Sequence, residues 1–291
     1  MTGIRCAFAA RDTLGESPLW CERTQTLWWL DIDGCKLHSL QPGSGRHLAH
    51  TFTAKFVGAL ALRSQGGILL ALDLALHVFD PASGELRLFA QVEPAHLDNR
   101  LNDGRCDAHG RFWVGTMDNG LTQPRGGFYR IDPDGKVTRQ FGDVIVANTI
   151  AISPDQKTLY FSDTRRHVTW AFDFDAERGC LGKRRVFVDY AASGDRPDGA
   201  CVDAEGFVWN AIFAGGRVVR YAPDGRVDRT IALPVTNPTC VCLGGPQLRT
   251  LYITTARKFL SSERLRAEPL AGALLAIDVD VEGLPEATFG A

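Results

Sequence analysis

The sequence lacks any apolar run near the roughly 18 residues that a membrane-spanning helix needs, so no such helix is expected. It also lacks clustered basic residues, since the net charge is -2 and the sequence pI is about 6.4. The basic groups at 165–166 and 183–185 are short, and solvated loop charge is the simplest interpretation of both. Binding to nucleic acid or to an anionic membrane is therefore not expected, because both require a concentrated positive field.

Cysteine is present, but not in a pattern that indicates a site. The chain has eight cysteines, yet no two of them form a C-x-x-C pair, which argues against a zinc knuckle or a thioredoxin-type redox pair. Several stand in apolar segments, as Cys201 does, where cysteine is usually a small buried hydrophobe. The first residues show no charged-then-apolar leader, so we expect a cytoplasmic protein with reduced thiols.

Two common catalytic patterns are also missing. No G-x-S-x-G segment occurs, so a serine nucleophile on a strand-to-helix turn is not expected. The seven histidines fall mostly in predicted outer strands or turns and show no metal-like spacing. His109 falls in a predicted turn and is expected to be solvated.

What the sequence does contain is an internal repeat. A strand rich in aromatic and branched residues recurs six times, at 27–30, 68–71, 112–115, 159–162, 207–210 and 251–254. The spacing of about 40 to 50 residues is typical of propeller blades. Each copy is followed by a strand that ends in an acidic or Pro/Gly turn, and then by a fourth strand. Asp134 and Asp224 each begin an Asp-Gly pair in such a turn, and both are interpreted as structural.

Four short strands repeated six times, with no long helical period, predict an all-β fold: a six-bladed β-propeller that spans residues 1–291 as one domain. The last repeat, at 239–288, is short of an outer strand, whereas residues 4–8 are spare at the other end. Because an open final blade would expose a strand edge, we expect the N-terminal strand to complete the last blade. A β-sandwich or a barrel is the alternative, but neither requires a six-fold repeat.

The repeat places oxygen-bearing side chains at one equivalent position in four blades. These residues are Glu16, Asn102, Asn148 and Asp198. The first strand of each blade lies nearest the axis of a propeller, so equivalent positions in these strands meet around the central channel. In the second and sixth blades the same position falls near Gly58 and near Thr239 or Cys240.

Each of the four residues alone has an ordinary interpretation, a surface carboxylate for Glu16 and a turn or loop residue for the others. Their shared place in the repeat favours a site, because packing alone would favour apolar side chains over buried carboxylates and amides. Two carboxylates and two amides suit a hard divalent cation. We expect one such ion, with Ca²⁺ preferred and Zn²⁺, Mn²⁺, Mg²⁺ or Fe²⁺ as alternatives.

The same segments resemble the senescence marker protein/gluconolactonase family, also called regucalcin-like, over essentially the whole chain. The resemblance is carried by LGESPLW at 14–20, NRLNDG at 99–104, ANTIA at 147–151, YFSDT at 160–164, RPDG at 196–199 and TAR at 255–257. It implies a six-bladed propeller that binds one divalent cation and hydrolyses sugar lactones. Family members often have Asn-Gly where this chain has Asn148-Thr149, so the pocket is expected to differ there.

The resemblance also implies roles for single residues. The metal ligands that it implies are Glu16, Asn148 and Asp198. The residues that it implies in contact with substrate or with metal-bound water are Arg100 and Asn102, and we place Asp103 with them in the substrate-binding set.

Our hypothesis for the reaction is metal-assisted opening of an aldono- or aldarolactone, such as glucono-, xylono-, arabinono- or galactarolactone, to the open-chain sugar acid. Asp198 is expected to hold or deprotonate the attacking water. Arg100 is expected to stabilise the developing oxyanion or to grip sugar hydroxyls. The loop residues Arg125, Arg257 and Lys258 either bind a sugar-acid carboxylate or face water.

Three alternatives stay open. The first is a Ca²⁺-binding regulatory propeller without turnover, the second is an interaction scaffold, and the third is an organophosphate or aryl-ester hydrolase. The fold alone does not choose among them. The expected partner is a small sugar lactone, and the expected state is a monomer or a weak oligomer.

Overall fold

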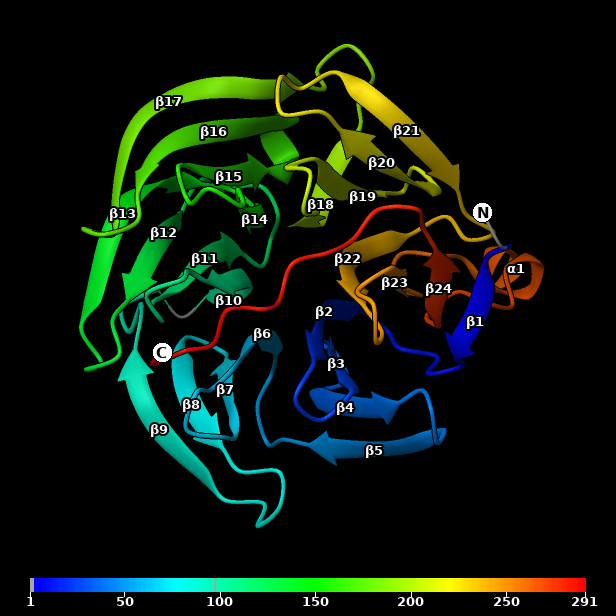
Figure 1. The fold of residues 1–291 in the computed structure, drawn as a ribbon, viewed down its shortest axis with the longest axis horizontal. Helices are drawn as coiled ribbons and strands as arrows, with labels where there is room; N and C mark the ends of the chain where they lie inside the picture. The colour runs from blue at the N-terminus through cyan, green and yellow to red at the C-terminus, as the bar shows by residue number, and fades with distance from the viewer. Residues whose placement is uncertain (1–2, 97) are drawn as a thin grey trace.

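A computed structural model describes residues 3–96 and 98–291, and its six four-stranded sheets stand in a ring (Figure 1). Residues 1 and 2 lie outside the described residues. The expectation that the first residues form no leader concerns the segment that they begin. Consecutive strands in each sheet pair antiparallel, so each sheet is one blade. The predicted all-β six-bladed propeller is confirmed.

The first three blades follow one another along the chain, each running from the axis outward. Blade one contains β2 (Gly15–Cys21), β3 (Thr26–Asp31), β4 (Lys36–Gln41) and β5 (Arg46–Thr51). Blade two contains β6 (Val57–Leu62), β7 (Ile68–Leu72), β8 (Ala75–Phe79) and β9 (Leu86–Gln91). Blade three contains β10 (Asn99–Cys106), β11 (Phe112–Asp118), β12 (Gly126–Ile131) and β13 (Val137–Val144).

The last three blades continue in the same order. Blade four contains β14 (Ala147–Ile152), β15 (Thr158–Asp163), β16 (Val168–Asp175) and β17 (Cys180–Asp189), with the 3₁₀ turn η1 (Thr164–Arg166) after β15. Blade five contains β18 (Arg196–Val202), β19 (Val208–Phe213), β20 (Arg217–Tyr221) and β21 (Val227–Ala232). Blade six contains β22 (Pro238–Gly244), β23 (Thr250–Thr255), β24 (Leu274–Asp278) and β1 (Arg5–Phe8), with the short helix α1 (Ser262–Ala267) after β23.

The N-terminal strand closes the ring, as the sequence predicts. β1 pairs antiparallel with β24, with Arg5 opposite Ala276, and so becomes the outer strand of the last blade (Figure 1). The Arg5 guanidinium also donates to both carboxylate oxygens of Asp278 at 2.9 and 3.0 Å. The outer edge of β24 is therefore covered by the start of the same chain, which removes a free edge that would otherwise invite pairing with another molecule.

Burial falls from the axis to the rim of each blade. The innermost strands β2, β6 and β14 are buried at every residue, whereas the outer strands β5, β9 and β21 are largely exposed. Large side chains, including Trp29, Trp113 and Trp209, are fully buried between the sheets. This gradient explains the aromatic and branched residues of the recurring second strand, which packs against neighbours on both faces.

Two buried aspartates confirm the alignment of the repeats. Asp107 accepts the indole N–H of Trp113 at 2.8 Å, and Asp203 accepts the indole N–H of Trp209 at 2.8 Å. Each aspartate also accepts two backbone amides of the turn that follows its strand. The repeat is therefore maintained by matching hydrogen bonds as well as by hydrophobic patterning.

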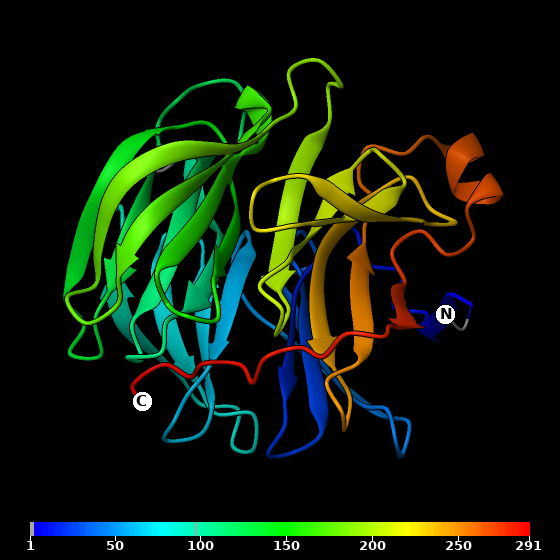
Figure 2. The same cartoon turned by 45° about the horizontal axis from the view of Figure 1, so that its top comes forward.

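The C-terminal segment crosses one end of the central channel. After β24 it runs beneath the inner strands (Figure 2), forming bridges from Gly283 to Asp203 and from Phe289 to Arg63. Glu286 in this segment accepts two hydrogen bonds from the Nη1 atom of the half-buried Arg105, at 2.8 and 2.9 Å. The inner strands finish at this end of the channel. The open cavity on the axis therefore lies at the opposite end, where the inner strands begin.

Among the described residues, no helix is long and apolar enough to cross a membrane. All eight cysteines are free thiols, and six of them are buried.

Candidate active site

Every inner strand breaks its pairing register near its start. The shifts fall after Glu16, Val57, Leu101, Asn148, Pro197 and Pro238. Such a bulge bends the strand and turns one or two side chains out of the ladder. Because it recurs in all six blades, the side chains at these positions are brought to the same level of the channel.

The four residues matched by the repeat do not occupy one identical ladder position. Glu16 and Asn148 are the last paired residues before their bulges, whereas Asn102 and Asp198 are the first unpaired residues within theirs. All four nevertheless line one cavity of about 570 Å³ at the end of the channel where the inner strands begin. The residues on either side of the bulge pair with equivalent partners in all four blades, so the sequence alignment is correct in register. Only the point at which the ladder opens differs by one residue.

A chain of hydrogen bonds connects the side chains on one side of the cavity. Asn102 donates its amide N–H₂ to the Asn148 Oδ1 atom at 2.8 Å, and the Asn148 amide donates to Thr164 Oγ1 at 2.8 Å. The Thr164 hydroxyl donates in turn to the carbonyl oxygen of Pro197 at 2.6 Å. This chain crosses from blade three to blade five and fixes the orientation of both amides.

The two carboxylates of the cavity are buried and close enough to interact. Burial raises the pKa of Glu16 to about 8, and the negative charge of Asp103 adds to the shift. Burial and the charge of Glu16 raise the pKa of Asp198 well above its ordinary value. The cation nearest to both is Arg100, whose own pKa burial lowers to about 10. The site therefore holds more buried negative charge than one guanidinium balances.

Arg100 is held in place by its neighbours. Its Nη1 atom donates to Asn102 Oδ1 at 2.5 Å and to the carbonyl oxygen of Leu101 at 3.0 Å. Its guanidinium also lies 5.6 Å from the ring centroid of Phe56. A cation fixed in this way inside a cavity can bind an anionic or partly negative oxygen without first losing side-chain entropy.

Thr149 stands where the family resemblance leads us to expect glycine, and its backbone conformation is one that glycine adopts at little cost. Its φ of 54° lies in the left-handed region, which is costly for a β-branched residue. The hydroxyl offsets part of this cost by donating to the carbonyl oxygen of Asp198 at 2.6 Å, and it accepts from the Asn210 amide at 2.9 Å. The threonine thus connects the backbone that carries Asn148 to the backbone that carries Asp198.

The remaining two positions of the predicted ring contribute no charged or amide side chain. A Cβ atom on Gly58 would lie 2.0 Å from the carbonyl oxygen of Leu101, so the neighbouring inner strand fills that place. Thr239 donates its hydroxyl to the carbonyl oxygen of Gly15 and so joins blade six to blade one. Cys240 packs against Gly199, where a Cβ atom would lie 2.2 Å from its sulfur.

Three residues named from the sequence do not form part of the cavity wall. Asp103 is predicted to bind substrate, but its two carboxylate oxygens accept the backbone amides of Gly104 and Ile150 at 2.9 and 2.7 Å, and it is not part of the cavity wall. Arg125 and Arg257, which are expected either to bind a sugar-acid carboxylate or to face water, do not line the cavity either. In each case the loop or strand directs the side chain elsewhere, which the sequence does not reveal.

Lys258, the third loop candidate, does line the cavity, but it forms an ion pair with Asp33 at 2.8 Å.

Predictions for other polar residues are confirmed. His109, Asp134 and Asp224 are exposed in turns, as expected.

The sequence analysis misses several residues of the cavity wall. Arg165, which the sequence suggests is solvated loop charge, and Arg196, which stands in one of the motifs, both line the cavity, as do Phe56 and Phe213. The spacing contained a signal for Arg196, because residues two apart on a strand share a face and Arg196 stands two residues before Asp198.

A cation at this site would need an amide ligand. No group of three or more His, Cys, Asp or Glu side chains that could hold a metal ion occurs among residues 3–96 and 98–291. The cavity does offer the carboxylates of Glu16 and Asp198 and the side-chain oxygen of Asn148. Oxygen ligands of this kind fit a hard divalent ion, which also relieves the repulsion between the two carboxylates.

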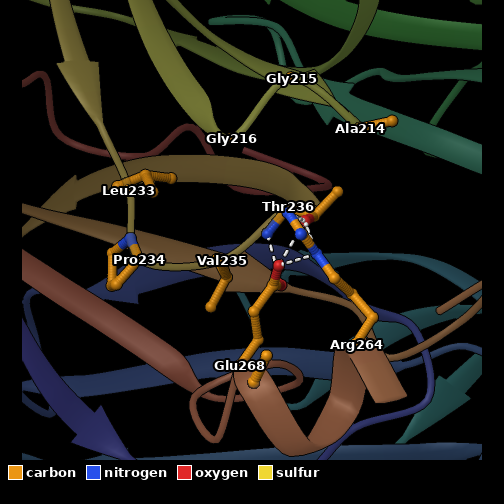
Figure 3. A pocket seen from close by; sticks show the side chains of 10 residues that line it. Ala214, Gly215, Gly216, Leu233, Pro234, Val235, Thr236, Arg264 and Glu268 are labelled. Atoms are coloured by element: carbon orange, nitrogen blue, oxygen red, sulfur yellow. Dashed lines mark hydrogen bonds and ion pairs between the residues drawn. The ribbon is translucent and has the colours of Figure 1, made fainter. Parts of the chain in front are cut away.

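A second cavity, of about 480 Å³, lies at the rim between blades five and six (Figure 3). Its polar groups bond to one another. Glu268 accepts the backbone amide and the hydroxyl of Thr236, and Arg264 donates to the same hydroxyl and pairs with Glu268. Since these charges are already paired, this cavity offers little for a ligand, and the axial cavity is the better candidate.

The raised pKa values of Glu16 and Asp198 predict how stability depends on pH. In a chelating buffer, we expect the Tm to fall as pH rises from about 4.5 to about 8, because the folded state binds protons that the unfolded state has already released. Thermal denaturation across this range measures the slope. The double variant Glu16→Gln, Asp198→Asn should flatten it, and an equal slope in both proteins would contradict the assignment.

Comparison with known proteins agrees with this fold and identifies a family. Residues 14–257 match the family described as the SMP-30/Gluconolactonase/LRE-like region. The chain is 41% identical to the 6-deoxy-6-sulfogluconolactonase of Pseudomonas putida over 292 residues, which cover 98% of each protein. It is 37% identical to the L-arabinolactonase of Azospirillum brasilense over 284 residues, which cover 96% of this chain and 93% of that protein.

Among solved structures, a calcium-binding protein, regucalcin, from Agrobacterium tumefaciens superposes with a TM-score of 0.95 at 34% identity, covering 99% of this chain and 98% of the other. The family model covers most of the chain, and the relatives span nearly all of it. The chain therefore belongs to the SMP-30/gluconolactonase/LRE-like family.

Proposed function

We propose that this protein is a lactonase that uses one divalent cation to open a sugar lactone to the open-chain acid. The observation that carries the proposal is the pair of buried carboxylates, Glu16 and Asp198, which share a cavity with the amide oxygen of Asn148. The relatives support the reaction class, since two of them are a 6-deoxy-6-sulfogluconolactonase and an L-arabinolactonase.

The chemistry of the ligand set supports a divalent cation. Glu16, Asn148 and Asp198 would hold it, with oxygen atoms only. When bound, such an ion polarises a carbonyl oxygen and lowers the pKa of a bound water. The solved relative described as calcium-binding makes Ca²⁺ the first ion to test, followed by Zn²⁺, Mn²⁺, Mg²⁺ and Fe²⁺.

The residues around this set have distinct tasks in the proposal. Asp198 accepts the proton of the attacking water through whichever carboxylate oxygen remains free. Arg100, which Asn102 and Phe56 hold in place, stabilises the negative charge that develops on the lactone oxygen. Asn102 also fixes the orientation of the Asn148 side-chain amide, because it donates a hydrogen bond to the Asn148 Oδ1 atom.

A panel of lactones tested with several metals examines this proposal directly. Chelator-treated protein should lose acid release from gluconolactone, arabinonolactone, xylonolactone, galactarolactone and 6-deoxy-6-sulfogluconolactone, and one divalent ion should restore it on at least one of them. The assay follows acid release with a pH indicator. The same panel without protein is the control, because lactones also hydrolyse spontaneously.

The principal alternative is a Ca²⁺-binding protein without turnover, which the description of the Agrobacterium relative favours. Calorimetric binding of Ca²⁺ at this site, together with no lactone opened above the spontaneous rate with any metal, would support that alternative and refute the lactonase.

A further inference from the structure

Two arginines on the wall of the axial cavity have no charged partner. Arg165 is exposed on η1, and Arg196 is half-buried at the start of β18. Among the described residues, neither side chain takes part in a hydrogen bond or an ion pair. Their neighbours differ in this respect. Arg166 pairs with Asp143 at 3.0 Å, and Arg217 pairs with Asp195 at 2.5 Å.

The backbone that carries these two arginines is held in one arrangement. Asp163 caps η1 by accepting the amide of Arg165 at 3.2 Å. Beyond the Thr164 hydroxyl that donates to Pro197, the ring of His167 bonds to the carbonyl oxygen of Asp195 at 2.7 Å. The turn is thus joined to the residues on both sides of Arg196, and the two arginines belong to adjoining parts of blades four and five.

The charges of the cavity wall do not balance. Its acids are Glu16 and Asp198, and its bases are Arg100, Arg165, Arg196 and Lys258. Lys258 is neutralised by Asp33, and the charge of Arg100 acts on the two acids of the wall. Within residues 3–96 and 98–291, the two remaining guanidiniums have no carboxylate partner, and a divalent cation on the acids would add more positive charge.

Arg196 is also spaced suitably from the reacting end of the cavity. It stands two residues before Asp198 on β18, so their Cα atoms are separated by about 6.5 to 7 Å along the strand. That separation is comparable with the length of a six-carbon sugar acid. A lactone whose carbonyl lies at Asp198 would therefore extend its far carbon toward Arg196 and Arg165.

We propose that the substrate is a lactone with a second, anionic group at the end of the sugar remote from the ring carbonyl, and that Arg165 and Arg196 bind this group. The inference rests on the lactonase function proposed above. A carboxylate, a sulfonate or a phosphate presents the two or three oxygens that guanidinium groups bind in a fork geometry. Neutral lactones leave both arginines without a partner and are the poorer substrates.

The test compares lactones that differ only at the far carbon: gluconolactone, its 6-carboxylate (glucarolactone) and its 6-sulfonate. The protein should open the better anionic lactone with a kcat/KM about 10- to 100-fold above that for gluconolactone. The double variant Arg165→Ala, Arg196→Ala should lose about 10- to 100-fold on the anionic lactone and less than about 2-fold on gluconolactone. Arg196→Lys should recover part of the loss, because it restores the charge without the fork.

Arg166→Ala is the matched control, since it removes the same charge from the same turn at a residue that already has carboxylate partners. It should leave the preference for the anionic lactone unchanged. Added salt should reduce the wild-type kcat/KM for the anionic lactone and have little effect on the double variant.

Two failures are distinguishable. If no lactone of the set is opened with any metal, the proposed function itself is refuted and this inference falls with it. If the lactones are opened but the anionic ones are not preferred, or if the double variant slows all of them equally, the function stands and the anion-binding role of the two arginines is overturned.

Discussion

Replacing Asp198 with asparagine should lower the kcat/KM of lactone opening by about 10³-fold while leaving the fold intact. The substitution keeps the shape of the side chain and removes the negative charge on which both the cation and the attacking water depend in the proposed function. Stability should not suffer in chelating buffer, because the raised pKa of Asp198 shows that its charged form is unfavourable there. Progress curves of acid release and thermal denaturation measure the two effects.

Asp224→Asn is the matched control for this variant. Asp224, like Asp198, precedes a glycine, but it lies in an exposed outer turn where it pairs with Arg226. The Asp224→Asn protein should open lactones at the wild-type rate. If Asp198→Asn retained activity within about threefold of wild type, Asp198 would have no role in the chemistry.

Replacing Asp107 with alanine should lower the free energy of unfolding by about 3 to 5 kcal/mol. The Asp107 carboxylate is buried and accepts four hydrogen bonds: the backbone amides of His109 and Arg111, the Nε atom of Arg111 at 2.7 Å and the indole N–H of Trp113 at 2.8 Å. Its removal leaves a largely buried guanidinium without its carboxylate and a fully buried indole without an acceptor. Urea denaturation followed by tryptophan fluorescence measures the loss.

The control for Asp107 is Asp134→Ala, in an exposed turn where the carboxylate accepts only the backbone amide of Lys136. That change should cost less than about 1 kcal/mol. The loss in the free energy of unfolding caused by Asp203→Ala should fall between these two values. Arg220 would still pair with the carboxylates of Glu205 and Asp228 after losing Asp203. An Asp107→Ala protein as stable as wild type would mean that these hydrogen bonds add no net stability.

The architecture was predictable because a propeller repeats its physical requirements along the chain. Each blade needs a buried second strand and a turn closed by polar side chains, so Trp113 and Trp209 recur with Asp107 and Asp203 at the same spacing. The closing role of β1 followed from the missing outer strand of the last repeat. The position of the candidate site followed in the same way, because equivalent positions near the start of the inner strands meet on the axis.

The inner-strand bulges limited what alignment alone could predict. Glu16 and Asn148 are still paired at the position where Asn102 and Asp198 already lie within a bulge, although all four reach the same cavity. Neighbouring side chains point to opposite faces in a regular strand, and a bulge breaks this alternation. Asp103 stands next to Asn102, yet the same bulge turns it toward backbone amides and away from the cavity.

The sequence by itself determined the number of blades, the way the ring closes and which residues come together on the axis, because these features depend on short-range patterns that repeat. Only the tertiary structure decided that Arg165 and Arg196 face the cavity without partners while Arg166 and Arg217 are paired. Whether a surface charge is balanced depends on which carboxylates from other turns and blades lie beside it, and no local pattern in the chain records that.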